Sequence, residues 1–342
     1  MSFILKILHI VPEFEEGGVE RYVLELCHEQ IAAGHDITLA TAGGKLENFL
    51  PKDVRLIHLP VQRKNLFTGL YCTKRLASSG KWDIIHAHSR VPAFIAWALS
   101  SLTKTRWLMT AHAPYSLNLG IWPLKRAHGV ICVSESVRKH LQDYLPPLNV
   151  TIPNGIWKPS AKWEGKYFPD NRKFLYIGYL AKRKGLDVAL KALGLLKNYE
   201  WTLDILGDGS QRPELEALVN ELGISERVKF YGFRDDAEIF MSRAACLLFP
   251  SYQEGLPLTV NEALAVGIPV IASDIEPLRP LSSGALVPPG DVEAWTEAIR
   301  RVINGGSASP LSSESLTTFS ETAEKTEEFY GRVLRGEGSS LR

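Results

Sequence analysis

The chain of 342 residues is long enough for two domains, and its 45% hydrophobic content is ample for packed cores. A formal net charge of +1 gives no overall basic field for nucleic acid. Four scattered cysteines without C-x-x-C spacing are typical of buried thiols in a reducing cytosol, and no uninterrupted apolar run approaches the ~18 residues of a membrane span. We therefore expect a cytoplasmic protein, soluble or peripheral at the cytoplasmic membrane.

Short apolar runs alternate with helical segments through the first half of the chain. Such alternation predicts βαβ units, hence a parallel sheet covered on both faces, with ligands at the carboxyl ends of the strands. Strands are predicted at Lys6–Val11, Asp36–Thr41, Val54–Leu59, Asp83–His88, Trp107–Ala111, Val130–Val133 and Val150–Ile152, and helices at Val19–Ala33, Pro92–Leu102 and Glu135–Tyr144.

The alternation stops at Ile152–Lys173, a proline-containing stretch of little periodicity that is typical of an interdomain linker, and then restarts. Two similar halves predict a cleft between domains. A polar connection at Gly305–Ser315 precedes a helical segment at Glu321–Leu334. The strands of the second half are predicted at Phe174–Ile177, Trp201–Leu206, Val228–Tyr231, Cys246–Phe249, Val270–Ala272 and Ala285–Val287.

The segment Phe249–Asp274 is predicted to form a strand, a loop, a helix and a strand, with Glu254 in the loop and Glu262 inside the helix. Pro257 suits the first helical position, and the free N–H groups of that first turn attract phosphate. Carboxylates on either side of a phosphate accept hydrogen bonds from sugar hydroxyls, which indicates a nucleotide-sugar site. On spacing alone, the preferred interpretation is structural: Glu254 as a helix-dipole partner and Glu262 as a solvated helix position.

The wider string EGLPLTVNEALAVGIPVIASD resembles the glutamate-x7-glutamate segment of glycosyltransferase family 4, whose members are retaining enzymes of the GT-B fold. The resemblance implies an α/β protein with two Rossmann-like parallel-sheet domains facing a central cleft. It places an acceptor-side domain at 1–158, joined by a C-terminal helix at 319–338, and a nucleotide-sugar-binding domain at 159–318.

Other motifs are similar to the same family. Gly17-Gly18-Val19-Glu20-Arg21 matches its G-G-x-E-R opening, although a loop-to-helix turn explains paired glycines as well. His112 matches the histidine that lies beside the transferred sugar, and His88 matches a supporting one. Buried histidines are more often satisfied core residues than ligands, so it is the resemblance that carries this assignment.

The basic loop Gly178–Gly185 departs from the family at one position. Its cations could neutralise a leaving diphosphate in place of a metal ion, and Lys184 matches the family lysine, but Tyr179 stands where arginine is expected. The alternative interpretation is a solvated basic turn that binds no ligand. Arg183 is the nearest substitute for the missing guanidinium, and Arg21 is another.

The resemblance implies catalytic roles for His112, Lys184 and Glu254, and it places His88 and Arg21 on the acceptor side. No residues have convincing metal-ligand spacing, so no metal or cofactor beyond the co-substrate is expected. The implied donor-binding residues are Gly17, Gly18, Arg183, Lys184, Gly209, Phe233, Glu254, Gly255, Leu256, Leu258 and Glu262.

The predicted function is that of a retaining glycosyltransferase, of EC 2.4 type, in bacterial cell-surface polysaccharide or lipopolysaccharide biosynthesis. It would move a sugar from a UDP-, GDP- or ADP-linked donor to a glycan or lipid-linked acceptor, with no nucleic-acid partner. The alternative is a catalytically inactive nucleotide-sugar-binding partner or regulatory subunit, which Tyr179 favours. The sequence leaves open the donor base and sugar, the acceptor and its linkage, and the oligomeric state.

Overall fold

The computed structural model describes residues 4–15, 17–62, 65–156, 161–164, 172–234, 236–254, 257–282, 286–306, 308 and 317–337. Residue contacts divide the chain into two compact units. Unit 1 comprises Met1–Gly155 and Thr317–Arg342, and unit 2 comprises Ile156–Leu316.

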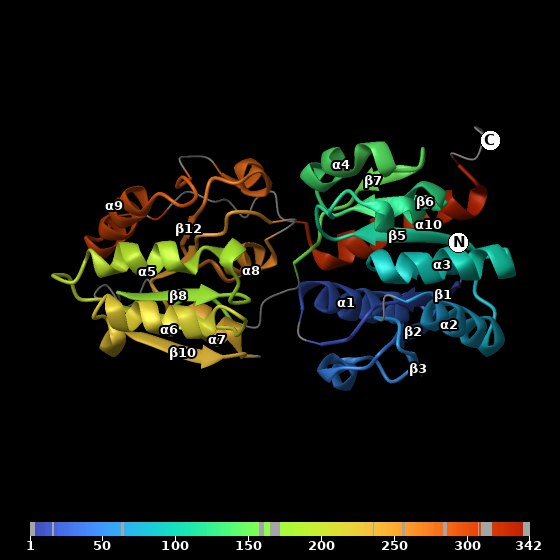
Figure 1. The fold of residues 1–342 in the computed structure, drawn as a ribbon, viewed down its shortest axis with the longest axis horizontal. Helices are drawn as coiled ribbons and strands as arrows, with labels where there is room; N and C mark the ends of the chain where they lie inside the picture. The colour runs from blue at the N-terminus through green and yellow to red at the C-terminus, as the bar shows by residue number, and fades with distance from the viewer. Residues whose placement is uncertain are drawn as a thin grey trace. The chain divides into compact units, whose positions relative to one another are not determined.

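Unit 1 is built on a sheet in the order β3-β2-β1-β4-β5-β6-β7, with parallel pairing throughout (Figure 1). The order reverses between β1 and β4, so the loops after these two strands diverge at the carboxyl edge of the sheet, where α/β folds bind ligands. The strands are β1 (Lys6–Ile10), β2 (Asp36–Thr41), β3 (Arg55–His58), β4 (Ile84–Ala87), β5 (Arg106–Ala111), β6 (Gly129–Cys132) and β7 (Asn149–Thr151).

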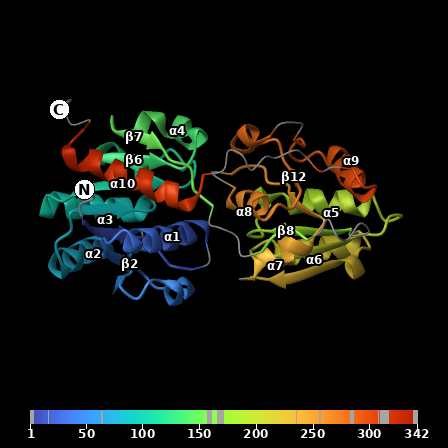
Figure 2. The same cartoon turned by 180° about the vertical axis from the view of Figure 1, so that it is seen from behind.

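Helices cover both faces of this sheet. The helices α2 and α3 contact each other on the face seen in Figure 1, and α1 and α10 lie side by side on the face seen in Figure 2. Side-chain caps begin α2 and α4, in which Asn65 accepts from the Thr68 N–H and Ser134 accepts from the Val137 N–H. The bounds are α1 (Gly18–Ala32), α2 (Leu66–Ser79), α3 (Arg90–Thr103), α4 (Glu135–Leu141) and α10 (Phe319–Arg335), with 3-10 turns at Lys45–Phe49, Leu119–Arg126 and Gln142–Tyr144.

The last helix, α10, belongs to unit 1 although all of unit 2 precedes it in the chain. It begins with a capping box between Thr318 and Glu321, and it buries Phe329 and Val333 on the sheet. A Cβ at Gly129 of β6 would lie 2.7 Å from Val333 and 2.9 Å from Phe329. Each buried apolar side chain contributes roughly 1.5 to 3 kcal/mol, so α10 is an integral part of this core.

Unit 2 has a smaller parallel sheet in the order β10-β9-β8-β11-β12, which reverses between β8 and β11. The helices α5, α6 and α9 pack on one face around the buried Trp295, and α7 and α8 pack on the other around Met241 and Val260 (Figures 1 and 2). The strands are β8 (Lys173–Ile177), β9 (Thr202–Leu206), β10 (Val228–Gly232), β11 (Cys246–Phe249) and β12 (Val270–Ala272). The helices are α5 (Leu186–Gly194), α6 (Arg212–Glu221), α7 (Ala237–Arg243), α8 (Leu258–Val266) and α9 (Val292–Ile303), with 3-10 turns at Lys182–Lys184, Ser225–Arg227 and Glu276–Leu281.

The predicted strands of both halves are confirmed to within a residue or two, with one exception. In the predicted strand Ala285–Val287, Ala285 lies outside the described residues, and Val287 makes a single parallel bridge to Ser273. The predicted helices are also confirmed, except that the segment Glu135–Tyr144 changes to a 3-10 turn after Leu141.

Candidate active site

The candidate donor site lies in unit 2, in the loops that follow β8 and β11. These strands flank the point at which the sheet order reverses, which is where the two loops open a crevice in α/β folds. The loop after β8 carries Arg183 and Lys184, and the loop after β11 carries Glu254. The sequence-predicted cations and the first motif glutamate therefore meet at one edge of the sheet.

An ion pair joins the two loops. The Lys184 Nζ donates to Glu254 Oε1 at 2.6 Å, and Arg183 Nη1 lies 3.7 Å from Glu254 Oε2. The Glu254 and Lys184 side chains are 8% and 16% exposed, whereas Arg183 is 57% exposed. Burial, and after it the charge of Glu254, raises the pKa of the neighbouring Tyr176 phenol above its usual range. Two cations thus surround one carboxylate, which leaves a local excess of positive charge for an incoming anion.

Gly185 explains how the two loops come so close together. It adopts φ +63°, and a Cβ there would lie 2.2 Å from the carbonyl oxygen of Pro250. A backbone bond from the Tyr252 N–H to the Arg183 carbonyl, at 2.9 Å, closes the same contact. Only glycine combines this left-handed backbone with such an approach, so Gly185 positions Lys184 against Glu254.

The loop after β9 supports the loop after β8. A Cβ on the predicted donor-site residue Gly209 would lie 2.4 Å from the Leu180 carbonyl oxygen, and one on Gly207 would lie 2.0 Å from the Gly178 carbonyl oxygen. The Leu180 N–H donates to the Asp208 carbonyl at 2.9 Å. Both glycines are therefore required by backbone contacts within the unit.

The second motif glutamate, Glu262, is half-buried in α8, which begins at Leu258. The prediction that Pro257 occupies the first helical position is wrong by one residue: Pro257 is the N-cap, and its carbonyl accepts from the Val260 N–H at 3.0 Å. Its ψ of 80° lies outside the helical region, which is why the helix starts one residue later. The predicted donor-site residues Gly255 and Leu256 lie outside the described residues.

Two aromatic side chains of the predicted site face solvent within unit 2. Tyr179, which replaces the family arginine, is 58% exposed, and Phe233, which follows β10, is 48% exposed. In place of a guanidinium at position 179, the structure presents Arg183 to the Glu254 carboxylate.

In unit 1 the predicted residues also gather where the sheet order reverses. Gly17 is the N-cap of α1, and a Cβ there would lie 2.1 Å from a carboxylate oxygen of Glu20. Arg21, in the first turn, lies 3.9 Å from Glu25. The paired glycines Gly17 and Gly18 are thus a loop-to-helix junction at the end of the loop that follows β1.

His88 and His112 follow the neighbouring strands β4 and β5, and they contact each other. His88 Nδ1 lies 3.3 Å from His112 Nε2, and the His112 ring packs edge-on against Tyr22 with centroids 4.9 Å apart. Burial lowers the pKa of His112 to about 3 and lowers that of His88 well below its usual value. Both imidazoles are therefore neutral at pH 7 and act as hydrogen-bonding groups.

Three buried histidines, His9, His86 and His88, have ring nitrogens within 4.8 Å of one another, a grouping that could suit a metal. Each nitrogen of these rings already has a hydrogen-bond partner: His9 bonds Gln30 and His88, and His86 bonds Tyr330 and Thr110, while His88 also bonds His112. A metal ion would have to displace these bonds, so the arrangement is that of a hydrogen-bond chain.

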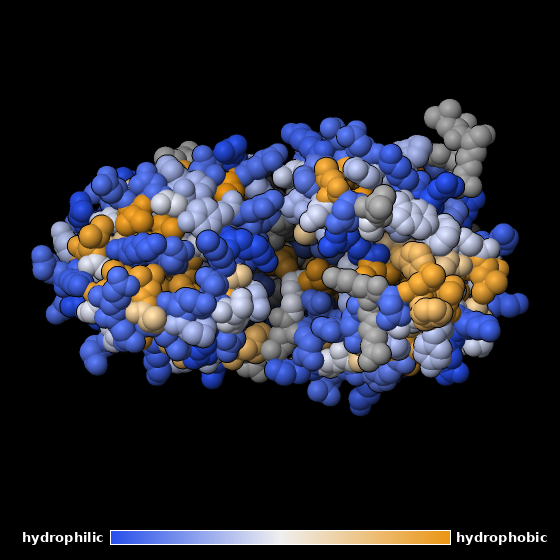
Figure 3. Space-filling model, in the orientation of Figure 1, coloured by the Kyte–Doolittle hydropathy of each residue, from blue (hydrophilic) through white to orange (hydrophobic). Residues whose placement is uncertain are grey.

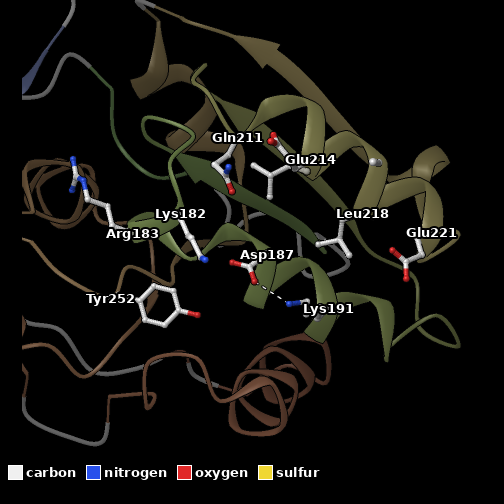
Figure 4. A pocket seen from close by; sticks show the side chains of 11 residues that line it. Lys182, Arg183, Asp187, Lys191, Gln211, Glu214, Leu218, Glu221 and Tyr252 are labelled. Atoms are coloured by element: carbon white, nitrogen blue, oxygen red, sulfur yellow. Dashed lines mark hydrogen bonds and ion pairs between the residues drawn. The ribbon is translucent and has the colours of Figure 1, made fainter.

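A separate cavity of about 660 Å³ lies between α5 and α6 (Figure 4). It shares Arg183 with the ion-paired loops, but Lys184, Glu254 and Glu262 are not among its lining residues. Its charges are mixed, and Asp187 already pairs with Lys191 at 3.0 Å. The cavity is therefore lined by charges of both signs and does not include the Lys184–Glu254 pair.

Two parallel-sheet α/β units, with glycine-bearing loops at the reversal of each sheet, are the architecture of the GT-B fold. Residues 158–326 match the family described as glycosyl transferases group 1, and residues 16–156 match glycosyltransferase family 4. The chain therefore belongs to the family 4-type glycosyltransferases, which confirms the resemblance, the fold class and the expected enzyme class.

Relatives similar in sequence to this chain are named as glycosyltransferases. An uncharacterized glycosyltransferase of Haemophilus influenzae is 26% identical, over 84% of this chain and 87% of the relative. A phosphatidyl-myo-inositol mannosyltransferase of Mycobacterium leprae is 29% identical over 83% of each chain. A lipopolysaccharide 1,6-galactosyltransferase of Salmonella typhimurium is 34% identical, over 39% of this chain and 40% of the relative.

Solved structures share the fold over almost the whole chain. A glycosyltransferase from Rickettsia africae superposes with a TM-score of 0.80 at 22% identity, covering 97% of this chain and 99% of its own. Anabaena HepE in complex with UDP-glucose gives a TM-score of 0.76 at 18% identity, covering 98% of this chain and 100% of its own. Among the described residues, no helix has the length and apolar character needed to cross a membrane.

The sequence reasoning missed the residues that support His112. His9, Gln30 and Tyr330 are completely buried and lie in one hydrogen-bonded group with it. The signal in the sequence was a polar residue, His9, within an otherwise apolar strand. In the structure, His9 of β1 pairs in register with His86 of β4.

Proposed function

We propose that the enzyme transfers a sugar from a nucleoside-diphosphate donor to a glycan or lipid-linked acceptor, with retention at the anomeric carbon and without a metal ion. The observation that carries this proposal is the largely buried Lys184–Glu254 pair, with Arg183 beside it, at the reversal of the unit 2 sheet. Fixed cations stabilise the charge that develops on a departing diphosphate, which is the work that a metal ion does in other transferases.

Each predicted residue has a role in this proposal. Lys184 and Arg183 stabilise the diphosphate, Glu254 accepts hydrogen bonds from the donor sugar, and Glu262 accepts them from the ribose. His112 orients the sugar. The leaving phosphate helps to take the proton of the acceptor hydroxyl on the same face, so that the new glycosidic bond forms as the phosphate bond breaks.

We place the reaction in bacterial cell-surface polysaccharide or lipopolysaccharide assembly, at the cytoplasmic side of the membrane. The lipopolysaccharide and phosphatidylinositol relatives support an acceptor that is attached to lipid. On unit 1, orange side chains gather over the region of α2 and α3 in Figure 3. The exposed side chains of α2 there include Leu66, Phe67, Leu70 and Tyr71, with Lys74 and Arg75 one turn further on.

Such a face combines apolar side chains with cations that attract anionic lipid. We expect co-sedimentation with anionic vesicles that weakens when Phe67, which is 85% exposed, is replaced by serine. Binding that Phe67→Ser leaves unchanged would contradict membrane contact through α2.

The test of the donor site is a thermal-shift screen of UDP, GDP, ADP and their sugars, followed by turnover assays on each compound that binds. Specific binding raises the melting temperature by mass action. Replacing Glu262 with alanine should weaken nucleotide binding by about 10- to 100-fold, because it removes hydrogen bonds to a carboxylate. The exposed Glu226 in a turn of unit 2 supplies the control, Glu226→Ala, which should not change binding.

Unchanged nucleotide affinity in Glu262→Ala would remove that residue from the site, and no thermal shift with any nucleotide would contradict the donor site as a whole. A shift without turnover, with glycan and lipid-linked acceptors supplied, would favour the inactive nucleotide-sugar-binding partner. The exposed Tyr179 at the family arginine position is the feature that makes this outcome worth testing.

A further inference from the structure

The side chains behind His112 form one continuous chain of hydrogen bonds through the core of unit 1. Its members come from α1, α10 and the ends of β1, β4 and β5, and each one is hydrogen-bonded to the next. In order, they are Thr110, His86, Tyr330, Gln30, His9, His88 and His112.

The direction of these bonds follows from the Gln30 side-chain amide. Its N–H group donates to the Tyr330 hydroxyl at 3.1 Å. Tyr330 is then free to donate its own proton to His86 Nδ1 at 2.7 Å. His86 therefore carries its proton on Nε2 and donates it to Thr110 Oγ1 at 2.7 Å.

The orientation of the Gln30 amide also fixes which atoms donate and which accept on the His9 side of the chain. With its N–H group on Tyr330, its carbonyl oxygen faces His9 Nε2 at 2.8 Å and must accept a proton from it. His9 Nδ1 is then the acceptor for His88 Nε2–H at 3.0 Å, and His88 Nδ1 is the acceptor for His112 Nε2–H at 3.3 Å. At the end of the chain, His112 Nδ1 is buried, unprotonated and without a hydrogen-bond partner among the described residues.

These directions require that each imidazole carries one proton. Burial lowers the pKa of His9 to about 4 and that of His112 to about 3. Burial and the neighbouring histidines lower the pKa values of His86 and His88 well below the usual value, so all four rings are neutral at pH 7.

We propose that this chain holds His112 in its Nε2–H tautomer, with Gln30 as the positioning residue that sets the direction, so that Nδ1 is a hydrogen-bond acceptor for a ligand hydroxyl. A buried acceptor without a partner costs about 1 to 3 kcal/mol, and a hydroxyl of the bound sugar would satisfy it. The identity of that hydroxyl rests on the proposed function, whereas the tautomer does not.

The first experiment measures the tautomer in the intact protein labelled with ¹³C,¹⁵N-histidine. Long-range ¹H–¹⁵N spectra at pH 7 distinguish Nε2–H from Nδ1–H, and ¹⁵N–¹⁵N couplings across N–H···N bonds identify bonded rings. We expect Nε2–H on His9, His86, His88 and His112, with couplings between His9 and His88 and between His88 and His112. A proton on His112 Nδ1, or the absence of these couplings, would overturn the proposal.

The second experiment reverses the direction. Gln30→Lys places an N–H donor against His9 Nε2, which should move the protons of His9, His88 and His112 to Nδ1. Gln30→Met has a similar size but neither the acceptor oxygen nor the N–H group, so nothing fixes the direction and both His112 tautomers should be present in this variant. A folded Gln30→Lys variant that keeps the wild-type tautomer would refute the role of Gln30.

The functional consequence is measured separately. In Gln30→Lys, Nδ1–H can no longer accept a sugar hydroxyl, so we expect the donor KM to rise about tenfold relative to the wild type. If the nucleotide screen fails while His112 is Nε2–H, the proposed function is wrong and the hydrogen-bond chain stands. If the donor binds but His112 is protonated on Nδ1, the chain is wrong and the function stands.

Discussion

The Lys184–Glu254 pair makes the most direct prediction about stability. Replacing Lys184 with methionine keeps the length of the side chain and leaves a carboxylate that is only 8% exposed. Removing one partner of a buried pair costs about 3 to 5 kcal/mol, because the other charge stays buried. Arg183, at 3.7 Å and 57% exposed, offsets about 1 kcal/mol of this. We therefore expect Lys184→Met to lose about 2 to 4 kcal/mol of unfolding free energy.

The matched control is Lys191→Met. Lys191 pairs with Asp187 at 3.0 Å, but these side chains are 46% and 36% exposed, so we expect a loss below about 1 kcal/mol. Urea denaturation followed by tryptophan fluorescence and circular dichroism gives the unfolding free energies. Donor turnover should fall by about one to two orders of magnitude in Lys184→Met, and it should not change in the control.

The double variant Lys184→Met/Glu254→Gln decides whether charge burial is the cause. It removes both charges, so it should be more stable than Lys184→Met alone. If the losses of the two single variants simply add, the pair is not energetically coupled and the reasoning is refuted.

Three further predictions concern single positions. Gly185→Ala should lower the free energy of unfolding by at least about 2 kcal/mol, because the residue has a left-handed backbone and its Cβ would clash with backbone atoms. Gly34→Ala is the control: its φ is +91° with nothing within 4 Å, so it should lose only about 1 kcal/mol. Equal melting temperatures for the two variants would contradict this. His9 and His112 have folded pKa values of about 4 and 3, below the unfolded value of 6.5, so unfolding takes up protons and stability falls as the pH drops from 6.5 towards 4. The slope approaches about 1.4 kcal/mol per pH unit for each histidine, and a flat profile of unfolding free energy would exclude neutral buried rings. Tyr179→Arg should raise donor turnover if a guanidinium is missing, and unchanged turnover would show that Arg183 already replaces it.

The elements could be predicted because their signals are local. Apolar runs in Cys246–Phe249 and Val270–Ala272, separated by a helical pattern, required nothing outside the segment itself. The start of α8 was predicted one residue too early, at Pro257, because the local sequence does not determine whether the ψ angle of Pro257 is helical. Glu254 was predicted in the loop at the carboxyl end of a strand, and it follows β11 in the structure, because parallel strands all end at one edge of a sheet.

The pairing of Lys184 with Glu254 and the chain behind His112 could not be predicted in the same way. Lys184 and Glu254 are 70 positions apart, and Gln30 and Tyr330 are 300 apart. Pattern reasoning sees the type of each residue but not the contact, which depends on side chains meeting across several elements. Gln30 in particular looks like an ordinary polar position in an amphipathic helix.

The return of α10 to unit 1 determines when unit 1 can finish folding during translation. All seven strands of the first sheet are translated before unit 2, yet the surface at Gly129 stays uncovered until Phe329 and Val333 have been made. All of unit 2 is translated in that interval, so the domain that starts first is completed last. An unfinished nascent chain therefore exposes an apolar sheet face for most of its elongation, and stalled or truncated chains that lack residues 319–335 are natural clients for chaperones.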